Sequence, residues 1–388
     1  MGSLKDRLEY ALKHNPKLYD VVASVVNFGL RTIGLFVPIK TNRVLFTGHG
    51  RKYNDSPKAL YEYMIAHHEY DRYELIWGLD NPETNAIPGR AKKIQTDTLS
   101  YFIYSMTCKY WITCVNIERG FRYKKKGIKY LNTWHGFPIK GTGLEMGRRA
   151  DDFSYIDYFC VAGDFDKKYY QDCFSIPDEH FLMVGFPRTD ELYHVSEQEI
   201  KQIKRKLNIP FDKKIIIYAP TWRDSVDGGK TYSIKPPIDM EKWKSELGDK
   251  YIVLMRLHPY TNKLLNLTFD KFTLDYSSYP NINDLLKISD ILISDYSGTF
   301  FEYAILERPI ICFGYDYEHY KLERGFGLDI EKELPGGVLK TEDDVINRIL
   351  NMDYEAECKM TANLKRKYLP NGGKATIECL RNMFGGTV

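Results

Sequence analysis

The stretch Ile291 to Leu306 reads ILISDYSGTFFEYAIL and predicts a buried strand, a polar loop and a helix in direct succession. Three apolar residues come first, Ser294 and Asp295 begin the loop, and a second apolar segment starts after Gly298. In an open parallel sheet, ligands bind in the crevice beyond the carboxyl ends of the strands. The stretch therefore predicts an α/β fold with a binding site where its strands end.

Short apolar runs recur along the chain, separated by stretches long enough for helical crossovers, as is typical of parallel sheets. They lie at 44–46, 75–77, 110–112, 130–131, 158–161 and 182–184, and then at 215–218, 251–254, 291–293 and 310–313. The segment between the two series, 185–212, contains a charged helix predicted at 196–207. We expect membrane-associating helices at 1–40 and two doubly wound Rossmann-like domains at 41–195 and 196–388, facing each other across a cleft.

Composition narrows the class of protein. With 388 residues, 43% of them hydrophobic, the chain is long enough for two domains with separate cores. A net charge of +3 indicates no nucleic-acid partner, and seven cysteines without CxxC spacing indicate reduced thiols in a cytoplasmic protein. Asp164 and Asp166 fit solvated acids on a helix, and no GxGxxG or HExxH motif is present. We therefore expect no cofactor and no metal.

The segment Val21 to Ile39 is mostly apolar but contains Arg31. A charged residue in the middle of a span costs roughly 2.5 to 3.5 kcal/mol on insertion scales, which disfavours a transmembrane helix. We expect a pair of interfacial helices, with apolar side chains at the acyl boundary and cations at the headgroups. These cations are Lys5, Arg7, Lys13, Lys17, Arg31 and Lys40. A helix packed on the protein's own core fits the periodicity equally well.

The loop before the helix predicted at 300–306 is a candidate phosphate site. Ser297 and Thr299 supply hydroxyl groups, Gly298 lets a ligand approach the backbone, and the helix N-terminus favours an anion. An ordinary helix cap is the alternative interpretation. Companion loops at neighbouring strand ends favour the phosphate site.

Cationic side chains follow two further strands. Arg223, with Thr221 in the same loop, is placed to clamp a diphosphate through paired hydrogen bonds, and a salt bridge is the alternative. Arg256 and His258 follow the next strand, where the histidine can donate to a phosphate oxygen as charge builds on a leaving group. These residues extend the candidate donor site.

His135 lies at a strand end of the other predicted domain. A histidine with a pKa near 6.5 can take a proton from an attacking hydroxyl at neutral pH, an effect of about 100-fold to 10,000-fold. A lone strand-end histidine is more often structural. Two histidines from opposed domains of one cleft favour catalysis.

Six motifs in order resemble the CDP-glycerol glycerophosphotransferase family of wall teichoic acid synthesis. They are Phe46-Thr47-Gly48 with Tyr53 to Pro57, His135 to Pro138, Gly185 to Asp190, Tyr218 to Arg223, Arg256 to Pro259, and Ser294 to Ser297. The resemblance covers nearly all of the chain from Arg43 onward. It implies a GT-B fold, CDP-glycerol as donor, and peripheral, monotopic attachment to the cytoplasmic face of the cell membrane.

The resemblance also implies roles for single residues. His135 matches the expected general base, His258 matches a histidine that contacts the donor pyrophosphate, and Ser297 and Arg223 match phosphate-binding positions. The cleft residues themselves supply the charge stabilisation in this scheme, without a metal ion.

Three positions depart from the family pattern. Gly298 stands where a second serine is usual, so Thr299 or bare backbone must replace one hydroxyl. Glu302 replaces an aspartate expected to contact ribose or glycerol. Phe137 replaces a small residue, and we expect it to reshape the entry for the acceptor.

The implied reaction transfers glycerol phosphate to a hydroxyl of a polyprenyl-diphosphate-linked disaccharide and releases CMP. The length of the chain favours a primase, which adds a single unit. Alternatives are a poly(glycerol phosphate) or ribitol-phosphate polymerase, a capsule transferase, a GT-B glycosyltransferase that uses a nucleotide sugar, and a protein that only binds the membrane. The sequence leaves the oligomeric state open, a homo-oligomer included.

Overall fold

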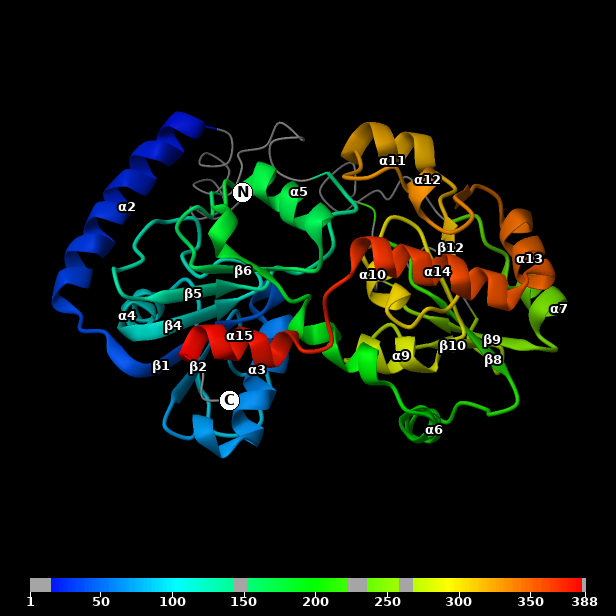
Figure 1. Ribbon diagram of the computed structural model, residues 1–388, viewed down its shortest axis with the longest axis horizontal. Helices are drawn as coiled ribbons and strands as arrows, with labels where there is room; N and C mark the ends of the chain where they lie inside the picture. Colours follow the sequence, from blue (N-terminus) through cyan, green and yellow to red (C-terminus); the bar gives the residue numbers. More distant parts are fainter. Residues whose placement is uncertain (1–14, 142–151, 222, 224–235, 258–267, 386–388) are drawn as a thin grey trace, which may run out of the picture.

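The computed structural model describes residues 15–141, 152–221, 223, 236–257 and 268–385, which build two sheets side by side (Figure 1). The first sheet has strand order β3-β2-β1-β4-β5-β6-β7 and the second β10-β9-β8-β11-β12-β13. All strand pairs in these sheets are parallel. In each sheet the order reverses beside the first strand, as in doubly wound folds. The predicted α/β class with parallel sheets is confirmed, and the arrangement is consistent with the GT-B type.

The elements of the first half are α2 (Pro16–Phe36), β1 (Lys40–Thr47), η1 (His49–Arg51), α3 (Asp55–Ala66), η2 (His68–Tyr70), β2 (Glu74–Leu79), β3 (Lys92–Gln95), α4 (Leu99–Thr107), β4 (Cys108–Thr113), β5 (Lys129–Asn132), β6 (Tyr158–Val161), α5 (Asp164–Phe174), η4 (Asp178–His180) and β7 (Phe181–Met183). The connection contains η5 (Pro187–His194) and α6 (Glu197–Lys206).

The second half contains β8 (Lys214–Tyr218), α7 (Met240–Leu247), β9 (Tyr251–Met255), β10 (Thr273–Asp275), α9 (Ile282–Ile288), β11 (Ile291–Ser294), α10 (Thr299–Ala304), β12 (Ile310–Phe313), α11 (Tyr317–Arg324), α12 (Ile330–Glu333), β13 (Val338–Leu339), α13 (Glu342–Asn351), α14 (Tyr354–Tyr368) and α15 (Ala375–Phe384). Every strand predicted from an apolar run is present. The edge strands β3 and β10 were missed because they are short and only partly apolar, and β13 because it has only two residues.

The chain passes between the two sheets twice. After β13, helices α13 and α14 cover the second sheet, and α15 then returns to lie against α3 and β5 of the first (Figure 1). Cys379 of α15 places its Sγ 3.3 Å from the Sγ of Cys160 in β6. The last helix of the unit predicted at 196–388 therefore packs on the first sheet, while the boundaries at 40 and 195 stay predictions.

The two crossing segments also contact each other. Gly185 has φ +80°, and a Cβ there would lie 2.8 Å from the carbonyl oxygen of Asn371. Gly372 contacts Tyr193 so closely that a Cβ would lie 2.2 Å from the phenol oxygen. Asp190 accepts hydrogen bonds from the backbone N–H groups of 375 and 376, at 2.9 and 2.7 Å. At Gly185 the two backbones approach too closely for a side chain, and at Gly372 the ring of Tyr193 occupies that space.

Helix α2 has two different apolar faces. The Asn15 side chain caps its first turn by accepting a hydrogen bond from the N–H of Leu18 at 3.1 Å. One face packs on the first sheet through Leu30, which is 6% exposed. The opposite face exposes Leu18, Val21, Val25, Phe28, Leu35 and Phe36. No helix among the described residues is both long enough and apolar enough to cross a membrane.

Candidate functional site

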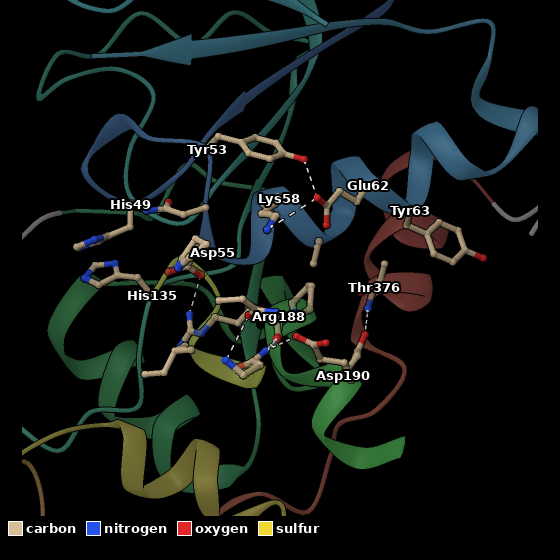
Figure 2. A pocket seen from close by; sticks show the side chains of 18 of the residues that line it. His49, Tyr53, Asp55, Lys58, Glu62, Tyr63, His135, Arg188, Asp190 and Thr376 are labelled. Carbon is tan, nitrogen blue, oxygen red and sulfur yellow. Dashed lines mark hydrogen bonds and ion pairs between the residues drawn. The ribbon is translucent and has the colours of Figure 1, made fainter. Parts of the chain in front are cut away.

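A groove of about 1110 Å³ runs between α3, the connection η5 and the start of α9 (Figure 2). His135 from the loop after β5 and Glu302 from α10 also line it. The groove is polar, since its other lining residues include His49, Tyr53, Asp55, Lys58, Glu62, Arg188, Asp190, Glu191, Asn283 and Lys374. Elements of both halves of the molecule therefore meet at one cavity.

His135 is held as a neutral base. Its Nδ1 lies 2.7 Å from the carbonyl oxygen of Cys114, which can only accept, so Nδ1 carries the proton and Nε2 keeps its lone pair. Burial lowers the pKa of His135, and His49 lowers it further from a ring-centroid distance of 4.9 Å. Trp134, the preceding residue, has φ +51°, and a side chain held in this region is typical of functional sites. His135 therefore lies at the groove, and its catalytic role stays a prediction.

Arg188 connects the two halves below His135 (Figure 2). Its Nη1 lies 2.7 Å from Asp55 Oδ1, and its Nη2 lies 2.6 Å from Glu302 Oε1. Burial opposes its charge, but the two carboxylates outweigh burial and raise the pKa of Arg188. Glu302, predicted to contact the donor's ribose or glycerol, here binds an arginine of the connection.

The loops after β5 and β11 lie against each other. A Cβ on Gly298 would lie 3.4 Å from both the N and O atoms of Phe137, so the glycine brings the two loops into contact. The ring of Phe137 stacks on Phe301, with centroids 3.6 Å apart. Phe137 is 6% exposed and does not line the groove, so its expected effect on the acceptor entry stays a prediction. Its ring joins the two halves.

The candidate phosphate loop keeps its polar groups half-buried. Ser297 donates from Oγ to Thr299 Oγ1 at 2.9 Å and accepts from the Thr299 N–H at 3.2 Å. The helix that follows, α10, is only six residues long, so its dipole contributes little. The two hydroxyls remain the features that fit a phosphate, because the bare side of Gly298 faces the backbone of Phe137.

Arg223 is paired with carboxylates. Its Nη1 lies 2.9 Å from Asp295 Oδ2, and its Nε lies 2.8 Å from Asp316 Oδ2. The N–H of Thr221, another predicted donor contact, binds Asp295 Oδ1 at 2.7 Å. The salt bridge left open as the alternative is present, and Arg223 would have to exchange a carboxylate for a phosphate to serve as the predicted clamp.

Arg256 is hydrogen-bonded to backbone carbonyl groups of the second half. Its Nη1 donates to the backbone oxygens of Tyr276, Ser277 and Tyr279 at 2.8, 2.7 and 2.5 Å. These bonds fix the loop after β10 and leave this nitrogen no capacity for a donor phosphate. His258, the second predicted histidine, lies outside the described residues.

Lys140 lies near Asp295 and Arg223 of the candidate donor loops, a neighbourhood that the sequence interpretation missed. Burial lowers the pKa of Lys140 to about 8. The charges of Arg223 and Arg324 lower this pKa further, whereas the charge of Asp295 raises it. Its backbone pairs with Phe326 of the second half. A lysine five residues after a strand-end histidine was a usable signal, since both belong to one loop.

His49, Asp55 and Arg188 were also missed as site residues. Asp55 and Arg188 stood in quoted motifs, but their pairing joins positions 133 residues apart and depends on tertiary structure. Asp166, interpreted as solvated, is buried and accepts from the N–H groups of Ala162 and Gly163 at 2.7 and 2.8 Å. Among the described residues, no group of three or more His, Cys, Asp or Glu side chains is arranged to hold a metal ion.

Two doubly wound parallel sheets with a polar groove between them define a class of two-domain α/β proteins that bind ligands at strand ends. The sequence model of the family CDP-Glycerol:Poly(glycerophosphate) glycerophosphotransferase matches residues 30–381. The chain belongs to this family, which confirms the resemblance drawn from its motifs.

Three curated relatives illustrate the family to which the chain belongs. A teichoic acid poly(glycerol phosphate) polymerase of Staphylococcus epidermidis is 34% identical over 87% of this chain, which spans about half (50%) of that relative. A teichoic acid glycerol-phosphate transferase of Staphylococcus aureus is 33% identical, with 79% of this chain and 83% of the relative covered. A poly(glycerol phosphate) polymerase of Bacillus spizizenii is 32% identical, with 86% and 89% covered.

Solved structures agree with the family. A histidine variant of the wall teichoic acid polymerase TagF superposes with a TM-score of 0.80 at 28% identity, covering 95% of both chains. The same variant soaked with CDPG gives a TM-score of 0.80 at 27% identity, covering 95% of this chain and 96% of that one. A UDP-GlcNAc 2-epimerase of Neisseria meningitidis, at 11% identity and a TM-score of 0.53, shares the fold alone.

Proposed function

We propose that this protein transfers glycerol phosphate from CDP-glycerol to a hydroxyl group of a lipid-linked acceptor and releases CMP. The observation that carries the proposal is His135, with Nε2 unprotonated, at a groove that both halves of the molecule line. The family's description and the TagF structure soaked with CDPG support the donor.

His135 begins the proposed reaction. The acceptor hydroxyl gives its proton to Nε2 of His135 while its oxygen forms a bond to the β-phosphorus of CDP-glycerol. The bond from that phosphorus to the bridging oxygen breaks, and CMP leaves with the bridging oxygen and its electron pair. The protein contributes by positioning the reactants in line and by placing fixed charge near the phosphates.

The loop after β11 is the proposed donor site. Ser297 and Thr299 offer hydroxyls, and the contact between Gly298 and Phe137 places this loop beside that of His135. Lys140, in the loop that also carries His135, adds a positive charge near Asp295 and Arg223. We propose no metal in this scheme, and activity that survives a metal chelator would support this part.

The proposed acceptor is a polyprenyl-diphosphate-linked disaccharide. The groove volume of about 1110 Å³ slightly exceeds the usual range of small-ligand sites, about 300 to 1,000 Å³, so it has room for a sugar acceptor. Of the described residues predicted to bind the donor, Glu302 is the one that lines this groove. The number of units added is a separate matter. The S. aureus glycerol-phosphate transferase favours the primase, whereas the B. spizizenii polymerase has 89% of its length covered, so chain length does not separate the two.

The exposed apolar face of α2 supports peripheral attachment to the cytoplasmic face of the membrane. Phe28 and Phe36 are 76% and 82% exposed on that face. Ser24 and Thr32 direct their hydroxyls to carbonyl oxygens one turn earlier, at 2.7 and 2.9 Å, so these groups would enter an apolar medium already hydrogen-bonded. We propose that this face lies in the lipid interface.

CMP release from CDP-glycerol, with a synthetic lipid-diphosphate disaccharide as acceptor, tests the function. We expect acceptor-dependent release that falls at least about 100-fold in His135→Ala. His319→Ala, which removes an exposed histidine from α11, is the matched control and should retain activity. One added mass unit would indicate a primase and a ladder of masses a polymerase. Absence of release with CDP-glycerol, followed by turnover of CDP-ribitol or a nucleotide sugar, would overturn the glycerol assignment.

A further inference from the structure

A second cavity, of about 280 Å³, lies beside α2 on the first half of the molecule. Five of its seven lining residues are cations, which distinguishes it from the main groove. The lining residues are Arg31, Glu118, Arg122, Lys124, Lys125, Lys126 and Tyr155. Nothing in the proposed transfer reaction uses these side chains.

The cavity is a built feature, because the helix and the loop that form it are bonded to each other. Asn27 of α2 accepts a hydrogen bond from the N–H of Arg122 at 2.7 Å, and Arg31 Nε donates to the Arg122 carbonyl oxygen at 2.7 Å. Arg122 also lies over the ring of Tyr155, 4.0 Å from its centroid. The polar edge of the helix and the loop 118–126 therefore form one rigid wall.

Its positive charge is only partly neutralised by the protein. Arg122 pairs with Asp152 at 2.8 Å, and Lys124 pairs with Asp157 at 2.7 Å. Among the described residues, Arg31, Lys125 and Lys126 have no carboxylate partner. Lys125 donates to the Val37 carbonyl oxygen at the end of α2.

Glu118 is the one acid that lines the cavity, and it faces the loop backbone. Its Oε1 accepts from the N–H groups of Tyr123 and Lys124, both at 2.7 Å. Burial raises the pKa of Glu118, which weakens any opposition to an anion. The cavity thus presents a concentrated positive charge.

The position of the cavity identifies the kind of anion. On α2, Asn27 and Arg31 lie on the edge between the face packed on the protein and the exposed apolar face that carries Phe28 and Leu35. A lipid whose acyl chains contacted the exposed face would place its phosphate at this edge. A free anion would gain nothing from the apolar residues next to it.

We propose that this cavity binds the phosphate headgroup of an anionic membrane phospholipid, with Arg31, Lys125 and Lys126 as its main cationic contacts. The site deepens the proposed membrane attachment and rests on it. Burial of the apolar face provides adhesion to any bilayer, whereas the cavity adds selectivity for anionic lipid and fixes the rotation of α2 about its axis.

Binding of the full chain to two kinds of vesicle tests the site. One vesicle contains phosphatidylcholine alone, and the other contains phosphatidylcholine mixed with phosphatidylglycerol. We expect tighter binding to the mixed vesicles, and Arg31→Gln with Lys126→Gln should weaken it roughly 20-fold, since each cation near an anionic surface contributes about fivefold. Binding to phosphatidylcholine alone should not change.

The matched control removes an arginine and a lysine elsewhere. Arg205 lies on α6 and Lys359 on α14, on the side of the molecule away from α2 (Figure 1). The variant with both Arg205→Gln and Lys359→Gln should change vesicle binding by less than about twofold. Arg31→Lys with Lys126→Arg should retain selectivity. A thermal melt of each variant reports its folding.

The outcomes test the headgroup cavity and the membrane attachment separately. Equal loss in the control pair, or retained selectivity in Arg31→Gln with Lys126→Gln, would overturn the cavity as a headgroup site. Failure of the wild type to bind either vesicle, or unchanged binding after Phe28→Ser with Phe36→Ser, would overturn the membrane attachment itself.

Discussion

Arg188 lies 2.6 Å from Glu302, so the connection between the sheets is bound to the helix that follows β11. The side chains of both residues are largely buried, at 14% and 16% exposed. A buried ion pair fixes geometry more effectively than it adds stability, because burial of both charges costs nearly what their attraction returns. The pair therefore fixes the helix that follows the candidate donor loop against the connection between the sheets.

Glu302→Gln tests this pair. The change leaves the Arg188 guanidinium with Asp55 alone, and the free energy of unfolding should fall by about 1 to 3 kcal/mol because a buried charge loses a partner. Glu318→Gln, which breaks an exposed pair with Lys340, should leave stability unchanged. Urea denaturation measures both. An equal effect in the two variants would contradict the role assigned to Glu302.

His135 should give the pH profile an acid limb below its usual position. Burial and His49 lower its pKa, and only the neutral form can accept a proton, so kcat/KM rises with pH through a value below about 6.5. His49→Gln removes the neighbour that lowers this pKa, so this limb should move to higher pH. His67→Gln, on the same groove wall, serves as the control. A wild-type limb above 6.5 would contradict the assignment.

Lys140 should set an alkaline limb. Its pKa of about 8 means that its positive charge is lost as the pH rises through that value. KM for CDP-glycerol should therefore increase above about pH 8. Lys140→Arg keeps its charge to a much higher pH and should remove the limb. An unchanged limb in that variant would assign it to another group.

Phe137→Ala should destabilise the junction of the two halves. The ring is buried against Phe301, and removal of a buried phenylalanine costs about 3 to 5 kcal/mol of unfolding free energy. Phe137→Leu should cost less because it retains more of the volume. Phe211→Ala, at a position 55% exposed, is the control for urea denaturation. A loss no larger than the control's would show that the junction does not depend on this ring.

The sequence predicted the backbone of this fold well, because strands such as Ile215 to Tyr218 are continuous apolar runs that only a buried parallel strand explains. It placed His135 at a cleft for the same reason, since strand ends meet at one edge of a sheet. Strand β3, Lys92–Gln95, has a single buried residue and gave no such signal.

The sequence did not predict which side chains pair with one another. Arg223 and Arg256 have the charge and the N–H donors of phosphate ligands. Arg223 is nevertheless paired with Asp295 and Asp316, and Arg256 is bonded to backbone carbonyl groups. Asp55 and Glu302 are brought to Arg188 only by the packing of two sheets. A local pattern identifies the charge of a residue, whereas its partner is decided by segments far away in the chain.

The contact between Gly185 and Asn371 bears on how the halves can move. Two halves joined at one point can rotate relative to each other in any direction, whereas two halves joined at two points can rotate only about the line through those points. The chain crosses between the sheets at two adjoining places, so opening and closing of the groove should reduce to rotation about the axis through them. Entry to the groove would then follow one path, and the loops after β5 and β11 would return to the same alignment each time the groove closes.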